Sequence, residues 1–357
     1  FKAINGAKAI ANTVSLDSNL TTIGDNITFN GNMTMTGDRV FLVMDATQTV
    51  TVNGVIDEGI YGNRTLLKTG RGTLVLTAAN TFSGETQLLD DSGKLILRGN
   101  GSILNSNTIR VGDKSQLVLD NSAVNLNNRL HDDVFYVANG GDLVLNGGSG
   151  GTTEAIGFFN GASDLSSGII VDSTGGGAHL VLRRTRLDGN GDLAVTSIAG
   201  NLGTTGLNRL TFEEVPVNEG LTDGVAPRIT VRGSTGLDFG TFASVSEGLA
   251  LVALSSTDYV TDINVAGPQT NVRLGAGVHT LTTSRTINSL YLEDGAILNG
   301  NGFALFVDSG AMVLGNNAVI NVETLNLSGR TYLKVDSGDT ATINSTVIGA
   351  ATAFSKV

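Results

Sequence analysis

Cysteine and tryptophan are absent from this chain, and only 3 of its 357 residues are proline. Without cysteine the fold can have no disulfide bonds, so its stability must come from burial over a large core. The densest apolar stretch, LALVAL at 249–254, is far too short to cross a bilayer as a helix. The sequence therefore predicts a chain that is free of disulfides and does not insert into a membrane.

Charge is also scarce: 15% of the residues are charged, and 33 acidic against 22 basic residues give a net charge of −11. An acidic surface repels nucleic acid and anionic membranes, so neither is an expected partner. The first residue is Phe1, and the N-terminal stretch lacks the charged and apolar regions of a signal peptide. We therefore expect this sequence to be a mature or internal piece of a longer protein.

Glycine is abundant, with 48 residues, and 40% of the chain is hydrophobic. This much glycine without a triplet period indicates many tight turns, and the hydrophobic fraction is too high for a disordered chain. Short runs of Val, Ile, Leu and Thr dominate, and long amphipathic helical patterns are lacking. The composition predicts an all-β protein.

Short apolar strands recur, each introduced by a small residue: TLVL after Gly72, KLIL after Gly93, QLVL after Ser115 and DLVL after Gly141. They follow one another at intervals of 21 to 26 residues, which is typical of a solenoid whose coils bury a shared core. The alternation predicts that Val75 and Ile96 point outward. The inward ladder should comprise Leu74, Leu76, Leu95, Leu97, Leu117, Leu119, Leu143 and Leu145. At this spacing the chain should form roughly 12–15 coils.

One segment, LLKTGRGTLVLTAANTFSGETQLLDDSGKLIL at 66–97, closely resembles the autotransporter-associated β-strand repeat. Matching positions are Leu66, Lys68, Gly70, Gly72 and Leu74, then Asn80, Thr81, Phe82, Ser83 and Gly84, then Gly93, Lys94 and Leu95. Asp90 and Asp91 depart from the family pattern, where small residues are usual, and suggest a longer turn. The resemblance implies a right-handed parallel β-helix like those in passenger segments of Gram-negative surface proteins.

A weaker resemblance covers 208–260, where GVAPRITV, DFGTF and EGLALV are similar to a module that interrupts long β-helical proteins. We therefore predict a right-handed parallel β-helix with a small inserted β-module. Its expected parts are β-helix coils at 1–206, including the repeat at 66–97, an irregular β-module at 207–262, and resumed coils at 263–357.

Candidate catalytic residues are few. His131, Asp132 and Asp133 could serve acid–base hydrolysis of a polysaccharide, but adjacent strand residues point to opposite faces, and a solvated corner explains them better. Arg183, Arg184 and Arg186 could bind an acidic glycan or a neighbouring subunit, or could form a solvated face. We expect no catalytic residues and no enzymatic activity.

The best metal candidate is the run of Asp188, Asn190 and Asp192, whose alternate oxygen ligands resemble the start of a calcium loop. Leu193 and Ala199 stand where such a loop has glycine and glutamate, so a tight turn is the simpler interpretation. We expect no cofactor, with calcium as a weak alternative.

The sequence thus favours a non-enzymatic structural or adhesive segment on the surface of a Gram-negative-type bacterium, or outside it. A polysaccharide lyase or hydrolase with a β-helix fold is the alternative. The apolar C-terminal stretch has no charge before Lys356 to protect it. We expect it to stack on further coils of a longer chain or on another subunit, in which case filaments form. Surface glycans or other cells are further expected partners.

Overall fold

The computed structural model describes residues 1–161, 165–173, 175–189, 191–199, 202–204, 208–217, 219–234, 236–327, 331–336 and 338–349, and the backbone of 353–356. The fold is nearly all β, and stacked parallel coils form a solenoid of about 14 turns. The parallel β-helix predicted from the repeat is confirmed, as is the expected number of coils. Among the described residues, no helix is long and apolar enough to cross a membrane.

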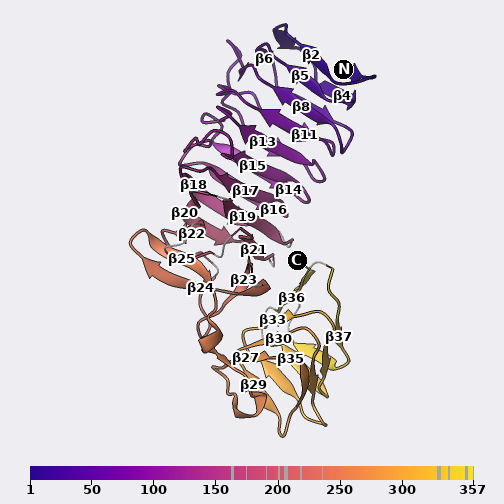
Figure 1. Cartoon of the computed structure of the whole chain (residues 1–357), viewed down its shortest axis with the longest axis vertical. Coiled ribbons are helices and arrows are strands. Elements are labelled where there is room, and N and C mark those ends of the chain that lie inside the picture. Colours follow the sequence, from indigo (N-terminus) through magenta and orange to yellow (C-terminus); the bar gives the residue numbers. More distant parts are fainter. Residues whose placement is uncertain are drawn as a thin grey trace.

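Two long ladders of parallel strands build what we call the first solenoid, which is the longer, upper unit in Figure 1. The first ladder contains β1 (Lys2–Ala3), β4 (Leu20–Gly24), β7 (Arg39–Val43), β10 (Leu66–Thr69), β12 (Thr86–Leu88), β14 (Thr108–Gly112), β16 (Phe135–Asn139), β18 (Thr152–Gly161), β20 (Ala178–Leu187) and β22 (Asn208–Phe212).

The second ladder contains β2 (Lys8–Ile10), β5 (Ile27–Phe29), β8 (Thr49–Val52), β11 (Thr73–Leu76), β13 (Lys94–Arg98), β15 (Gln116–Asp120), β17 (Asp142–Gly147), β19 (Ser167–Ser173), β21 (Leu193–Thr196) and β23 (Ala226–Gly233). A short third sheet closes the earliest coils and contains β3 (Val14–Leu16), β6 (Met33–Met35) and β9 (Ile56–Asp57).

Parallel pairing ends in antiparallel hairpins at the lower end of the first solenoid. Here β24 (Gly236–Val245) pairs with β23, and β25 (Gly248–Ala253) pairs with both β24 and β22. Gly236 and Gly248 sit in the two tight turns at φ values of +112° and +123°, which residues with a side chain rarely adopt. These hairpins are the small inserted β-module that the sequence predicted. Its limits at 207 and 262 stay predictions, and β22 and β23 still pair in parallel with the coils before them.

A second solenoid begins after the short 3₁₀ turn η1 (Ser256–Asp258), and a second such turn, η2 (Ile263–Val265), follows its first strand. One of its sheets, called sheet F below, contains β26 (Tyr259–Val260), β27 (Asn271–Leu274), β30 (Ser289–Leu292), β33 (Ala311–Leu314), β36 (Tyr332–Val335) and β39 (Ala353–Lys356). The second sheet contains β28 (Gly277–Thr280), β31 (Ala296–Asn299), β34 (Ala318–Asn321) and β37 (Ala341–Ile343). The third contains β29 (Arg285–Ile287), β32 (Leu305–Val307), β35 (Thr324–Leu327) and β38 (Thr346–Gly349).

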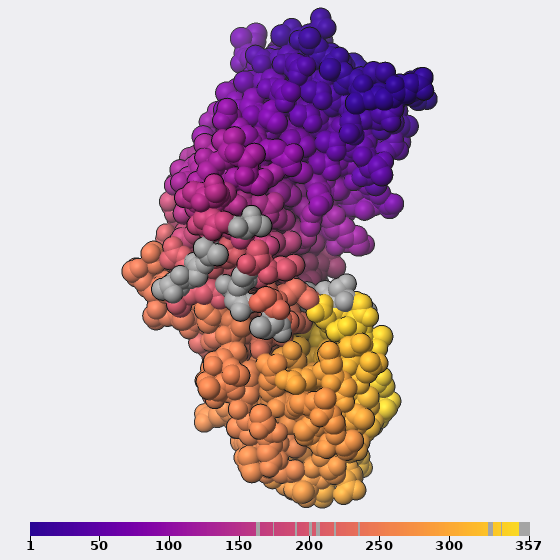
Figure 2. Space-filling view, viewed as in Figure 1, coloured from indigo at the N-terminus to yellow at the C-terminus, as the bar shows by residue number. Residues whose placement is uncertain are grey.

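The two solenoids together make a body that is much longer than it is wide, with the second below the first (Figures 1 and 2). Each has its own continuous apolar core. A third, smaller apolar cluster lies between them and joins residues of β24 to the outward face of sheet F.

The predicted inward ladder is confirmed, since all eight leucines are buried in the core of the first solenoid. Val75 lies outside that core, as its alternate position predicts, yet it is only 4% exposed. Thr51 and Ile96 stand beside it in register on the outward face and cover much of its surface. An outward position in a stack of coils is therefore more protected than one at the edge of a sheet.

Lys68 is also fully buried, although it carries an amine. Its Nζ donates hydrogen bonds to the carbonyls of Gly70 and Ser92, both at 2.6 Å. Burial lowers the pKa of Lys68 to about 7. This lysine of the repeat thus ties one corner of its own coil to a corner of the next.

We predict that Leu95→Ala lowers the free energy of unfolding by about 2–5 kcal/mol, because it leaves a cavity in the stacked core. Ile96→Thr, on the outward face of the same strand, should change it by no more than about 1 kcal/mol. Urea denaturation of both variants and the wild type measures the difference. A larger effect at Ile96 than at Leu95 would mean that the strand register is wrong by one residue.

Candidate functional site

The junction between the two solenoids brings several hydrogen-bonded polar side chains together beside a cavity. The outward face of sheet F lies against the hairpins that close the first solenoid, and apolar residues from both sides meet there. These residues are Val225, Leu237, Phe239, Leu254, Tyr259, Ala311 and Val313. The lateral face of one stack therefore covers the end of the other.

Arg273, on β27, is the central polar residue of the junction. Its Nη1 donates to Asp238 Oδ2 at 3.0 Å and its Nε to Glu293 Oε1 at 2.7 Å. The guanidinium also lies 4.4 Å from the centroid of the Tyr291 ring. One arginine is thus held by two carboxylates and an aromatic ring, which is a favourable setting for a partly buried cation.

Asp238, on β24, receives a second donor from the Tyr259 hydroxyl. Burial raises the pKa of Asp238, and the hydrogen bonds from Tyr259 and Arg273 act in the opposite direction. Burial also raises the pKa of Tyr259 well above its usual value, and the Asp238 charge adds to this effect. Both carboxylate oxygens of Asp238 therefore already accept hydrogen bonds, one from Tyr259 and the other from Arg273.

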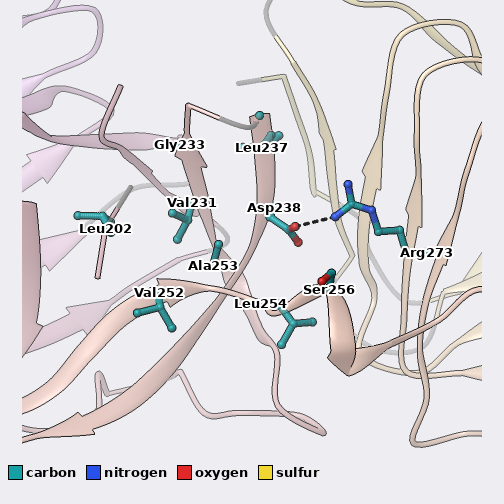
Figure 3. A pocket seen from close by; sticks show the side chains of 11 residues that line it. Leu202, Val231, Gly233, Leu237, Asp238, Val252, Ala253, Leu254, Ser256 and Arg273 are labelled. Carbon is teal, nitrogen blue, oxygen red and sulfur yellow. Dashed lines mark hydrogen bonds and ion pairs between the residues drawn. The ribbon is translucent and has the colours of Figure 1, made fainter. Parts of the chain in front are cut away.

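A cavity of about 440 Å³ opens beside this pair. Figure 3 shows Asp238 and Arg273 in direct contact at one side of it, with apolar side chains on the β23 and β25 side. A second cavity of about 360 Å³ shares Gly236, Leu237 and Arg273 with the first and has an acidic lining that includes Glu293, Asp294, Asp336 and Asp339. Arg273 binds Asp238 and Glu293 rather than leaving them free for a ligand. We therefore interpret this arrangement as a structural joint between the two solenoids, with two cavities beside it.

Two further ion pairs cross the junction. Arg232 of β23 binds both oxygens of Asp336, and Lys334 of β36 binds Asp192. Lys334 is almost fully buried, and burial lowers its pKa to about 7. Charges of opposite sign therefore fix how sheet F sits on the last coils of the first solenoid.

Asp132 and Asp133, the candidate catalytic carboxylates, both contact Arg183, the first of the three arginines. Arg183 Nη1 donates to Asp133 Oδ1 at 2.6 Å, and its Nη2 donates to Asp132 Oδ2 at 3.2 Å. His131 Nδ1 accepts the backbone N–H of Asp133 at 3.0 Å within the same turn. Gly157 belongs to the coil between them, where a side chain would come within 2.5 Å of Asp133 Cα. The group is an ion pair that spans two coils, and the prediction of no catalytic residues stays a prediction.

The other two arginines lie further along the same strand. Arg186 Nε donates to Asp188 Oδ1 at 2.6 Å. Arg184 is exposed and makes no ion pair with any residue in the described part of the chain. The three arginines therefore do not act as one cationic patch.

The calcium candidates are only partly described, because Asn190 lies outside the described residues. Asp188 binds Arg186 and Asp192 binds Lys334. The backbone carbonyls of Leu187, Gly189 and Gly191 accept hydrogen bonds from the Arg228 guanidinium. The described oxygens of this loop thus already bind three cationic side chains of the protein, Arg186, Arg228 and Lys334, and calcium binding stays an untested alternative. Across the residues that the structure describes, no three His, Cys, Asp or Glu side chains group in a way that could hold a metal ion.

Sequence reasoning missed a groove on the outward face of the first ladder. Its volume is about 680 Å³, and its lining is Thr69, Gln87, Leu88, Leu89, Asp90, Arg110, Val111, Gly112, Val137 and Asn139. The turn at Asp90 and Asp91, where the sequence departs from the repeat family, forms one wall. That departure was the only signal in the sequence that pointed to this place.

Glu154, on β18, is a fully buried carboxyl close to the His131 corner. It accepts the backbone N–H groups of Arg129 and Leu130, both at 2.9 Å. Burial raises the pKa of Glu154 from its usual 4.5 to about 7, and these two donors act against the rise. The group therefore exchanges its proton near neutral pH, inside the core.

Comparisons with protein-family models, curated proteins and solved structures found no match to this chain. The β-helical fold and the repeats are shown by the structure.

We predict that Arg273→Gln loosens the junction. Asp238 would lose a charged partner while remaining half-enclosed, so the free energy of unfolding should fall by about 1–3 kcal/mol. Limited proteolysis should then cut faster at 254–258, which connects the two solenoids. Arg71→Gln is the matched control, because the Arg71–Asp91 ion pair is solvent-exposed and should contribute no more than about 1 kcal/mol. Equal effects of the two variants would contradict a structural role for Arg273.

Stability should also fall as the pH rises from 4.5 to 7. The folded protein keeps the Glu154 proton up to about pH 7, whereas the unfolded chain releases it near 4.5. The stabilisation by this group is therefore complete below pH 4.5 and lost by pH 7, with an upper bound of about 3 kcal/mol. Urea denaturation at pH 5, 6 and 7 measures the slope. Burial also raises the pKa of Glu219 to about 7, which acts in the same direction, and lowers the pKa of His179 to about 4, which acts in the opposite direction. Glu154→Gln cannot titrate and should make the fall with pH smaller by its share; an unchanged slope in this variant would assign the effect to the other groups.

Proposed function

We propose that this chain is a non-enzymatic β-helical segment of an autotransporter-type surface protein, and that it acts outside a Gram-negative bacterium as a structural or adhesive element. The observation that carries the proposal is that the carboxylates of the candidate sites form ion pairs with basic side chains of the same protein. Asp132, Asp133, Asp192 and Asp238 each bind an arginine or lysine side chain of another coil or of the other solenoid, and Asp188 binds Arg186 of its own coil.

Enzymatic acid–base chemistry needs a carboxyl or imidazole that is free to exchange a proton with a substrate. Asp132 and Asp133 both form an ion pair with Arg183. Asp238 lies between Tyr259 and Arg273. These contacts support a scaffold in which charge holds coils together.

The last coil of the second solenoid supports the proposal of stacking. Strand β38 is exposed along its whole length, with Val347 41% and Ile348 46% exposed. Within the described residues, β38 pairs only with β35, so its other edge offers free backbone groups. Such an edge readily accepts another strand, either from further coils of the same chain or from a second copy. Self-association is thus the proposed partner interaction, and other cells or surface glycans are the proposed targets of adhesion.

We predict self-association of this chain at high concentration. Sedimentation velocity over a concentration series should show growing species, and electron microscopy should show bodies joined through the last coil of the second solenoid, which lies on the flank of the molecule (Figure 1). Ile348→Lys adds a charge to the exposed strand and should shift the association to at least tenfold higher concentration. Ile297→Lys, at an outward position of β31, which is paired with a strand on each side, is the control and should leave it unchanged. A chain that stays monomeric at all concentrations would contradict stacking between copies, and release of new reducing ends from a polysaccharide would contradict the non-enzymatic assignment.

A further inference from the structure

The groove on the first ladder lies where several coils present polar and apolar side chains side by side. Gln87, Arg110 and Val137 stand opposite one another in register on β12, β14 and β16. Coils in such a ladder repeat about every 4.8 Å, so these side chains form a regular row along the solenoid. The row suits a long ligand that crosses several coils.

A second outward row runs beside the first. It contains Thr108, Phe135, Phe158 and Arg184, again in register. The rings of Phe135 and Phe158 stack with centroids 5.1 Å apart, and Phe135 remains 36% exposed. An aromatic surface thus lies next to the groove on the same face of β16.

The far wall of the groove is fixed by the turn at 89–91. Asp91 has a φ of +53°, and Asp90 Oδ1 accepts the backbone N–H of Asp113 at 2.9 Å. Gly112 makes this possible, because a Cβ there would lie 2.3 Å from Asp90 Oδ1. Leu89, 44% exposed, stands on the rim of this wall. The concave shape is therefore built into the backbone.

The floor of the groove cannot bind a peptide as an added strand. Strands β12, β14 and β16 run across it, and each is paired with the coils before and after it. An extended peptide gains its affinity from the free backbone of a sheet edge, which the floor does not offer. Recognition must come from side chains alone.

The charges of the groove argue against a polyanion. Arg110 Nε lies 3.3 Å from Glu85 Oε2, and Gln87 Nε2 donates to the same oxygen at 2.6 Å. The cation is thus balanced locally, in a protein of net charge −11. The groove therefore offers the planar amide and guanidinium groups of Gln87, Asn139 and Arg110 beside exposed apolar side chains.

We infer that the groove binds an extended, uncharged oligosaccharide. Arg110, Gln87 and Asn139 offer hydrogen bonds to hydroxyl groups, and Phe135 and Leu89 offer apolar surface to the faces of sugar rings. Such a mixture of a few convergent polar groups with apolar surface is typical of small-molecule sites. The inference rests on the proposed adhesive function and names the class of ligand that it takes.

Isothermal titration calorimetry of the full chain with cellohexaose, maltohexaose, chitohexaose and a hexamer of galacturonic acid tests the inference. At least one uncharged hexamer should bind with an affinity that changes little between 50 and about 500 mM salt, because no charges are neutralised on binding. The acidic hexamer should bind at least tenfold more weakly. Failure of all three uncharged hexamers to bind, or tighter binding of the acidic one, would overturn the inference.

Variants locate the site. Arg110→Ala and Phe135→Ser should each weaken binding at least tenfold, with a thermal unfolding curve like that of the wild type. Lys94→Ala removes an exposed cation from β13 on the other ladder and is the control. If Lys94→Ala weakens binding as much as Arg110→Ala, the ligand does not occupy the groove.

The two proposals can fail separately. A chain that self-associates but binds no hexamer would overturn the groove assignment and leave the structural role intact. A hexamer that is bound and then shortened, as seen by mass spectrometry, would support the groove and overturn the non-enzymatic assignment.

Discussion

Every coil of this protein depends on the coils before and after it, both for its backbone hydrogen bonds and for cover of its apolar side chains. The repeat at 66–97 is a set of contacts that meets this need. Asn80 accepts the backbone N–H of Ile56 from the preceding coil and donates to the carbonyl of Ser102 in the next. Lys68 reaches the carbonyl of Ser92 in the same way. Residues that look scattered in the sequence are therefore the points at which three successive coils are fastened.

The last coil of such a stack has no following coil to cover it, so other contacts must do so. In the first solenoid these contacts are apolar packing and ion pairs. Its last parallel strands turn into antiparallel hairpins, and sheet F of the second solenoid covers them. Burying ions such as Lys334 and Arg273 costs desolvation energy, which close partners must offset. Arg273 has Asp238, Glu293 and the Tyr291 ring as such partners. The junction therefore specifies one relative orientation, since any other would leave these charges unpaired.

Strand alternation and glycine-led phrases were sufficient to predict the fold class and the inward leucines, because both follow from local periodicity. The pairing of Arg183 with Asp133 could not be predicted in this way. It joins residues 50 positions apart and depends on the register of three coils and on the missing side chain of Gly157. The junction was also hidden, since Tyr259, Arg273 and Tyr291 occupy outward positions that normally face solvent. Only the arrangement of the two stacks shows that these side chains are covered.

Two kinds of cohesion thus coexist in the chain, and they differ in mechanical strength. Within each stack, rows of backbone hydrogen bonds share a load over many strands. Between the stacks the load passes through a few side-chain contacts and the single covalent connection at 254–258. Tension applied to the two extremities therefore concentrates at the junction, which opens while both stacks remain folded. The protein is built as two stiff segments with a yielding hinge between them, so it lengthens under tension before any of its coils unravel.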